Sequence, residues 1–168
     1  SLWLCLGCQH LEPTKKPKSK MKDLVKERLI QWEALVLKPY ECSQGYTTIG
    51  VGRNLETNGI SKDEAIYLLD NDIDSVIKKL DKHWPVWATF PEEAKAVIMD
   101  LVFNMGINTW LSFRKTRAYM ELGEWEKAGK ELLNSKYAQQ VGRRAIFNSE
   151  ELKKCQQKVQ TNTSETQE

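Results

Sequence analysis

The stretch from Leu29 to Leu55 constrains the fold more than any other part of the chain, because a helical pattern gives way there to a glycine-rich segment. Just before and at its start, apolar residues recur at the spacing of one helix face: Leu24, Val25, Leu29 and Ile30. Pro39 then interrupts any helix, and three glycines at positions 45, 50 and 52 punctuate a run of Tyr, Thr, Ile and Val. The pattern predicts a helix over Met21–Leu37 and a small sheet region over Lys38–Thr57.

Glu33 stands near the end of this helical pattern, among the apolar residues Trp32, Ala34 and Leu35. A carboxyl group beside apolar side chains is partly desolvated, so it keeps its proton more readily. That property suits a group that donates a proton during catalysis. The sequence therefore makes Glu33 a candidate general acid.

The rest of the chain has mostly helical patterns. Ser61 and Glu64 form a capping box that opens an amphipathic helix of about twenty residues, well placed to join a small lobe to a larger one. Its acidic residues are expected to form a solvated face. Further helices are predicted over Glu92–Met105, Thr109–Leu122, Glu124–Leu133 and Tyr137–Cys155, the last interrupted at Gly142. Trp110, Phe113 and Trp125 are expected to be core residues rather than sugar-binding platforms.

Both ends of the sequence differ from the middle. Residues 1–20 are expected to be a disordered leader or extension, with a membrane-targeting remnant as the alternative. Residues 156–168 are polar and lack aromatic side chains, which predicts a disordered tail. We find no internal repeat and no apolar stretch long enough to span a membrane. The folded domain is therefore predicted over residues 21–155.

Composition and cysteine spacing give no positive indication of a nucleic-acid partner, a metal site or a cofactor. A formal net charge of +2 gives no argument for nucleic-acid binding. Cys5, Cys8 and His10 form a C-x2-C-x-H pattern, but no second ligand cluster follows, so no metal site and no cofactor are predicted. The other two cysteines are Cys42 and Cys155.

The spacing of three polar residues carries a family resemblance. Glu33 is followed after eight residues by Cys42 and after five more by Thr48, within the pattern E-x6-Y-x4-GYTTIGVGRNL. This pattern resembles the active-site signature of the phage-type lysozymes, the muramidases of glycoside hydrolase family 24, in its Cys variant. Further landmarks occur in the same order: Phe103–Gly106 with Phe113, Gly123–Gly129 and Gln139–Ala145. The resemblance covers roughly Met21–Ala145.

The resemblance implies an α+β fold that is mainly α. A small N-terminal β-sheet lobe would lie at about residues 33–60, followed by a long connecting helix and a helical C-terminal lobe at about residues 80–155. The substrate cleft would lie between the lobes. The implied protein is a monomeric endolysin that cleaves the β-1,4 bond between N-acetylmuramic acid and N-acetylglucosamine of bacterial peptidoglycan. It would be made in the host cytoplasm and act on the periplasmic or extracellular cell wall.

The resemblance also implies roles for individual residues. Glu33 is the general acid, and Cys42 and Thr48 assist the attacking water. Glu41, next to Cys42, is a less suitable second carboxylate, because successive side chains of an extended segment point to opposite faces. Arg144 would hold the Glu33 carboxyl in place, with Arg143 as its neighbouring candidate. The implied substrate-binding residues are Phe103, Asn104, Thr116 and Glu131.

Two other functions and one form of regulation fit the same residues. A lytic transglycosylase needs only one acid/base Glu, and a catalytically silent peptidoglycan-binding module would follow if Cys42 disabled the site. A disulfide from Cys42 to Cys5, Cys8 or Cys155 would block the thiol under oxidising conditions.

Overall fold

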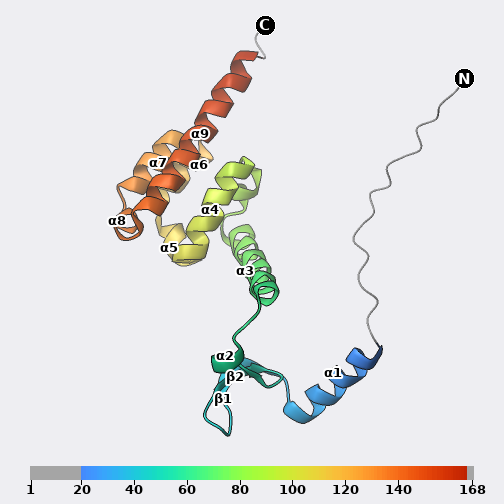
Figure 1. Cartoon of the computed structure of the whole chain (residues 1–168). Helices are drawn as coiled ribbons and strands as arrows, with labels where there is room; N and C mark the ends of the chain where they lie inside the picture. Colours follow the sequence, from blue (N-terminus) through green and yellow to red (C-terminus); the bar gives the residue numbers. More distant parts are fainter. Residues whose placement is uncertain (1–19, 166–168) are drawn as a thin grey trace, which may run out of the picture. The chain divides into compact units, whose positions relative to one another are not determined.

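The chain, seen in a computed structural model, is described over residues 20–165, so almost all of the predicted leader and residues 166–168 lie outside this part. It separates into two compact units, residues 1–61 (unit 1) and residues 62–168 (unit 2) (Figure 1). Unit 1 carries the sheet, and the described part of unit 2 is helical. The molecule is thus mainly α with a small antiparallel sheet near its N-terminus, as predicted.

Unit 1 begins with one helix and continues as a three-stranded antiparallel sheet in the order β1-β2-β3. Its elements are α1 (Lys20–Glu33), β1 (Val36–Glu41), β2 (Thr47–Gly50), β3 (Arg53–Asn54) and α2 (Leu55–Asn58). The predicted end of the first helix at Leu37 was wrong, because Ala34 has a φ of 62° and the helix ends at Glu33. The strand that follows begins at Val36, inside the range predicted to be helical.

The central strand β2 pairs with β1 on one side and with β3 on the other. Thr48 lies opposite Tyr40 of β1 and opposite Asn54 of β3. Asn54 also ends the sheet, because its side-chain oxygen accepts hydrogen bonds from the backbone N–H groups of Glu56 and Thr57 and so caps α2. Thr48 is 3% exposed and lies between two neighbouring strands of the sheet.

Unit 2 is a helical bundle. Its elements are α3 (Lys62–His83), the 3-10 helix η1 (Pro85–Thr89), α4 (Glu92–Met105), α5 (Ile107–Ser112), α6 (Arg114–Glu121), α7 (Trp125–Leu133), α8 (Lys136–Val141) and α9 (Arg143–Glu165). The single helix predicted over 109–122 was wrong, since Phe113 has non-helical backbone angles (φ −76°, ψ 61°) and divides α5 from α6. Helix α9 also continues ten residues past Cys155, where the sequence predicted a disordered tail.

Aromatic side chains form the centre of unit 2. The Trp110 ring is fully buried, packs edge-on against Trp84 and stacks on Phe113. Phe90 contacts both Trp84 and Trp125 in edge-to-face geometry. The expectation that Trp110 and Trp125 are core residues is confirmed, since both are buried within this cluster.

Helices α7 and α9 make the most extensive contact between helices of unit 2. They approach closely at Gly129, where an added Cβ would lie 2.9 Å from Ser149 Oγ and 3.0 Å from the Ser149 carbonyl oxygen. Glycine is therefore required here by the proximity of the neighbouring backbone.

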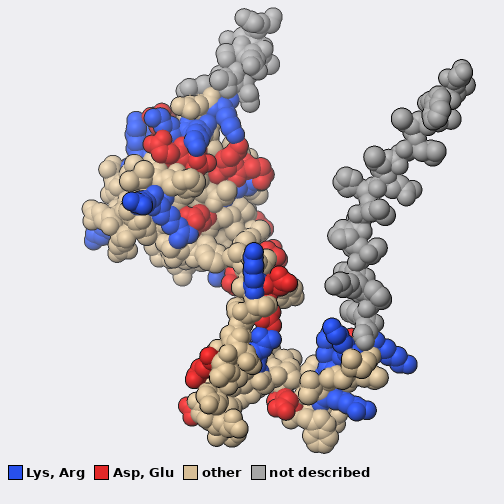
Figure 2. All heavy atoms as spheres, in the orientation of Figure 1, with Lys and Arg blue, Asp and Glu red and all other residues tan. Residues whose placement is uncertain are grey.

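The visible surface of unit 2 has Lys and Arg side chains interspersed with Asp and Glu (Figure 2). Several of these form ion pairs along one helix, such as Lys154 with Glu151 on α9 and Lys130 with Glu126 on α7. Within residues 20–165, no helix combines the length and apolar character needed to cross a membrane.

Replacing Gly129 by alanine is expected to lower the free energy of unfolding by about 1–3 kcal/mol, because the added methyl group would overpack the α7–α9 contact. At a solvent-exposed helix position the same change would stabilise the protein, since alanine favours the helix more than glycine does. Thermal unfolding of Gly129→Ala and of the exposed neighbour Lys130→Ala measures the difference. A higher melting temperature for Gly129→Ala would contradict the close contact.

Candidate active site

The turn between β1 and β2 brings Cys42 and Thr48 together. The Cys42 N–H donates to the Tyr46 carbonyl at 3.0 Å, and the Cys42 carbonyl accepts from the Gly45 N–H at 2.8 Å. The Thr48 hydroxyl donates to the same Tyr46 carbonyl at 2.9 Å. Gly45 has a φ of 81°, a conformation that glycine adopts without strain. Cys42 and Thr48 therefore both donate a hydrogen bond to the same carbonyl group, that of Tyr46.

The thiol of Cys42 lies in a polar environment. Its pKa is lowered from that of an ordinary cysteine, chiefly by the backbone N–H of Tyr46 and then by that of Gln44. The Thr48 hydroxyl adds a smaller effect in the same direction, and partial desolvation opposes it. Hydrogen bonds to the charged form stabilise it, so the turn favours the thiolate.

Glu33 is the last residue of α1, and its carboxylate lies against the β2–β3 turn. A Cβ on Gly52 would lie 3.6 Å from Glu33 Oε2, and Gly52 has a φ of 72°. Glu33 itself is exposed, as are Trp32 (80%) and Leu35 (56%). Within unit 1 the desolvation expected from its sequence neighbours is not observed, because Trp32 and Leu35 are themselves exposed and do not cover the carboxylate.

Two other carboxylates lie near the hairpin. Glu41 is exposed at the end of β1, opposite Thr47. Glu56, which the sequence analysis missed, accepts hydrogen bonds from the Thr47 N–H at 2.9 Å and the Thr47 hydroxyl at 2.8 Å. These bonds lower the pKa of Glu56, so it remains ionised and holds α2 against the hairpin.

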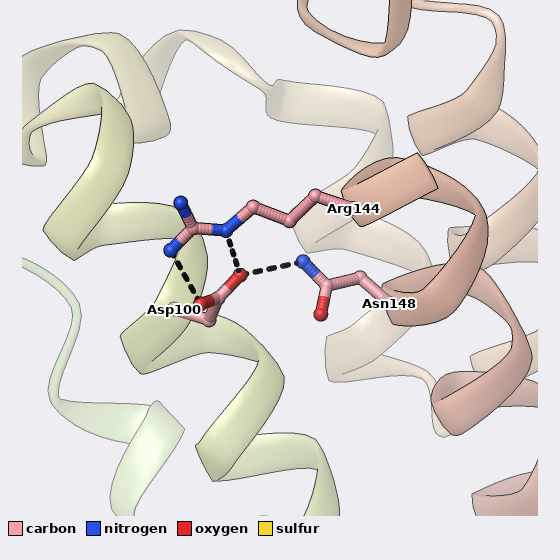
Figure 3. A network of polar contacts seen from close by, with 3 residues as sticks. All are labelled: Asp100, Arg144 and Asn148. Carbon is pink, nitrogen blue, oxygen red and sulfur yellow. Dashed lines mark hydrogen bonds and ion pairs between the residues drawn. The ribbon is translucent and has the colours of Figure 1, made fainter. Parts of the chain in front are cut away.

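Arg144 takes part in a polar network in unit 2 (Figure 3). Its Nε donates to Asp100 Oδ2 at 2.9 Å and its Nη2 to Asp100 Oδ1 at 2.6 Å. The buried Asn148 donates from Nδ2 to Asp100 Oδ2 at 2.8 Å. The Arg144 guanidinium is the main reason that the pKa of Asp100 lies below its usual range. The network joins α4 to α9.

Asp100 was missed by the sequence analysis, although a signal was present. It is a lone acidic residue between Val97 and Phe103, in an otherwise apolar stretch of helix. A charged residue in such a position needs a partner. The predicted role of Arg144 toward Glu33 stays a prediction, since these residues belong to different units. Arg143, its neighbour, is exposed.

The predicted substrate-binding residues all lie in unit 2. Phe103 and Asn104 are exposed near the C-terminal end of α4. Thr116 and Glu131 are brought together, because both line a hollow of about 350 Å³ formed by α6, α7 and the residues beside them. The other lining residues are Ser112, Phe113, Arg114, Lys115, Asn134 and Ser135.

The described residues contain no group of three or more His, Cys, Asp or Glu side chains that could hold a metal ion. Cys5, Cys8 and His10 lie outside the described part of the chain. Cys42 and Cys155 are free thiols, and burial raises the pKa of Cys155. The predicted disulfide to Cys42 stays a prediction.

Comparison with known proteins places the chain in a family. The fold is a lysozyme-like, mainly helical α+β fold. Residues 30–147 match the family model for phage lysozyme. The chain is 26% identical to probable T4-type lysozyme 1 of Dictyostelium discoideum, over 72% of this chain and 88% of that protein. It is also 29% identical to the pre-baseplate central spike protein of Enterobacteria phage T4, over 71% of this chain and 26% of that protein.

The chain therefore belongs to the phage lysozyme family. It is a lysozyme, a hydrolase that acts on peptidoglycan.

Alkylation by iodoacetamide is expected to modify Cys42 well before Cys155, because Cys42 is half-buried with a lowered pKa and Cys155 is buried with a raised one. The pH midpoint of the Cys42 reaction should lie below that of a cysteine in an unstructured peptide, because the pKa of Cys42 is lowered. Mass spectrometry of peptides from samples quenched at a series of pH values measures both.

The variant Thr48→Val should raise that midpoint, since it removes a hydroxyl group that favours the thiolate. Thr47→Val is the matched control, because the Thr47 hydroxyl donates to Glu56. An equal midpoint for Thr48→Val and the unmodified protein would show that the hydroxyl does not act on the thiol.

Proposed function

We propose that the protein hydrolyses the β-1,4 bond between N-acetylmuramic acid and N-acetylglucosamine, with Glu33 as general acid and with Cys42 and Thr48 assisting the attacking water. One observation carries the proposal. In the sheet of unit 1, the Cys42 N–H and the Thr48 hydroxyl donate hydrogen bonds to the same Tyr46 carbonyl group. Gly52 of the same sheet region lies beside the Glu33 carboxylate. Three residues that are separate in sequence thus gather around one small sheet.

Glu33 would protonate the oxygen of the leaving sugar. Breaking a glycosidic bond requires this proton and also stabilisation of a positively charged, oxocarbenium-like sugar. The second requirement is usually met by a carboxylate, and Cys42 stands at that position in this chain. A thiolate at Cys42 supplies the negative charge, which its lowered pKa supports.

Thr48 would orient the attacking water. Its one hydroxyl hydrogen can be donated to the Tyr46 carbonyl or to the Cys42 thiolate, and in either case the oxygen can still accept a hydrogen bond from water. Water attack from the face opposite the leaving group inverts the anomeric centre. A thiolate is also a nucleophile, and direct attack by Cys42 would give retention instead.

Residues of unit 2 would bind and orient the substrate. Arg144 is proposed to support the Glu33 carboxyl, and the exposed Phe103 and Asn104 to contact the sugar chain. Thr116 and Glu131 share one hollow, which supports a common role in saccharide binding. The proposed protein is a monomeric endolysin that is made in the host cytoplasm and acts on the periplasmic or extracellular wall.

Glu33→Gln is expected to lower the rate of lysis by about 10²-fold or more, because the amide cannot donate the proton that the leaving oxygen needs. The loss of turbidity of Gram-negative cells with permeabilised outer membranes measures the rate. Glu41→Gln is the matched control, since Glu41 is exposed and lies next to Cys42. Cys42→Ser, measured alongside, shows how much the thiol contributes.

The masses of the released muropeptides distinguish the remaining functions. Hydrolysis adds one water per bond cleaved, whereas a lytic transglycosylase forms a 1,6-anhydro sugar without adding water. A silent binding module would bind peptidoglycan and release nothing, even with thiol reductant present. Either result would contradict the proposed hydrolysis.

A further inference from the structure

The peptide group between Tyr46 and Thr47 is held by hydrogen bonds at both of its ends. Its carbonyl oxygen, which belongs to Tyr46, accepts from the Cys42 N–H at 3.0 Å and from the Thr48 hydroxyl at 2.9 Å. Its N–H, which belongs to Thr47, donates to Glu56 Oε1 at 2.9 Å. A peptide group is planar, so its C=O and its N–H turn together. The bond to Glu56 therefore also fixes the direction of the carbonyl group that Cys42 and Thr48 share.

The Glu56 carboxylate occupies a position where the sheet has no third strand. Strand β3 ends at Asn54, which lies opposite Thr48, so β3 offers no partner to Thr47. A backbone N–H beyond the end of the neighbouring strand needs another acceptor. Glu56 Oε1 supplies it, and the same oxygen also accepts from the Thr47 hydroxyl at 2.8 Å. The side chain of Glu56 thus continues the hydrogen bonding of the sheet by one residue.

The backbone at Glu56 is fixed in turn by the cap of α2. The side-chain oxygen of Asn54 accepts from the N–H groups of Glu56 and Thr57, both at 3.0 Å. Asn54 also pairs with Thr48 in the sheet. The contacts therefore form a closed circuit from Thr48 through Asn54 and Glu56 back to Thr47. Within the described residues of unit 1 only Thr48 is buried, so these contacts rather than a core set the local geometry.

The charge of Glu56 strengthens this arrangement. The backbone N–H of Thr47, and then its hydroxyl, lower the pKa of Glu56, so the carboxylate is ionised at neutral pH. A hydrogen bond to a charged acceptor is stronger than one to a neutral acceptor. Hydrogen bonds in a chain also polarise one another, so a strong bond at the N–H of a peptide group makes its carbonyl oxygen a better acceptor.

We propose that Glu56 is a positioning residue of the lysozyme reaction, which holds the peptide group between Tyr46 and Thr47 in its orientation. That orientation keeps Cys42 and Thr48 on one carbonyl group. This inference rests on the proposed function, in which Cys42 and Thr48 assist the attacking water. Glu56 does not touch the substrate in this scheme, because it acts through the peptide group and the two residues bound to it.

The pH midpoint of Cys42 alkylation tests the proposal without substrate. Glu56→Ala frees the peptide group, so the donors that favour the thiolate are no longer held beside the sulfur, and the midpoint should rise by about half a unit or more. Glu56→Gln keeps an oxygen that can accept from the Thr47 N–H, so the midpoint should rise less. Loss of a nearby negative charge alone would instead lower the midpoint in both variants. An unchanged or lower midpoint in Glu56→Ala would overturn the proposal.

Glu41→Ala is the matched control, because Glu41 is an exposed carboxylate next to Cys42 and opposite Thr47, and no residue within 20–165 bonds to its side chain. Its midpoint should not rise. The rate of lysis should fall about three- to tenfold in Glu56→Ala, mainly in kcat, since displaced groups position the water less well. It should fall less in Glu56→Gln and stay unchanged in Glu41→Ala. If Glu56→Ala lowered only the melting temperature, Glu56 would have a purely structural role and the proposal would fail.

The Thr47 amide proton, followed by NMR in the unmodified protein, tests the bond without any substitution. Its chemical shift should change as Glu56 is protonated, at a pH below that typical of a glutamate in an unstructured peptide. The Gly45 amide, which donates to the Cys42 carbonyl, is the reference and should change little. A Thr47 amide that did not follow this titration would overturn the proposal.

The two proposals fail in distinguishable ways. If the unmodified protein lyses cells but the Cys42 midpoint does not respond to Glu56→Ala, the positioning role of Glu56 fails alone. If the midpoint responds as expected but the unmodified protein releases no muropeptides, the proposed function fails, and the part of Glu56 in the reaction fails with it.

Discussion

The packing of α9 against α7 and α4 is the constraint on which the rest of unit 2 depends. Because Gly129 has no side chain, α9 can approach α7 until the Ser149 backbone lies where a methyl group would otherwise be. That approach sets the position of α9, and with it the positions of Arg144 and Asn148, which lie one helical turn apart. Both then reach Asp100 on α4. A steric requirement at one glycine thus determines where a polar network forms.

Unit 1 is organised differently, by hydrogen bonds rather than by a core. Among its described residues only Thr48 is buried. The turn bonds of Cys42, the Thr47–Glu56 contact and the Asn54 cap fix the backbone locally. Small sheets have little apolar surface to bury, so local bonds account for a larger share of their order. The same bonds hold Cys42 and Thr48 together and direct peptide N–H groups toward the thiol.

Local patterns predicted much of the molecule. The bounds of α4 were predicted as observed, since its apolar residues have a clear helical period and Pro91 precedes it. The long helix α3 was expected from its capping residues and period. The division at Phe113 was not predicted, because the helical period runs through this residue. In the fold its backbone is non-helical and its ring stacks on Trp110. The exposure of Glu33 was also missed, since a run of apolar letters does not show which way each side chain points.

The sequence by itself determined the family, the helical periods and the spacing of Glu33, Cys42 and Thr48. These properties are local, or they depend only on the order of residues along the chain. The tertiary structure decided which distant residues meet: Thr116 with Glu131 in one hollow, and Asp100 with Arg144 across 44 residues. The physical reason is that helix packing brings such partners together, and packing depends on the shapes of many side chains at once. No spacing in the sequence indicates that Asp100 would find its partner on the last helix.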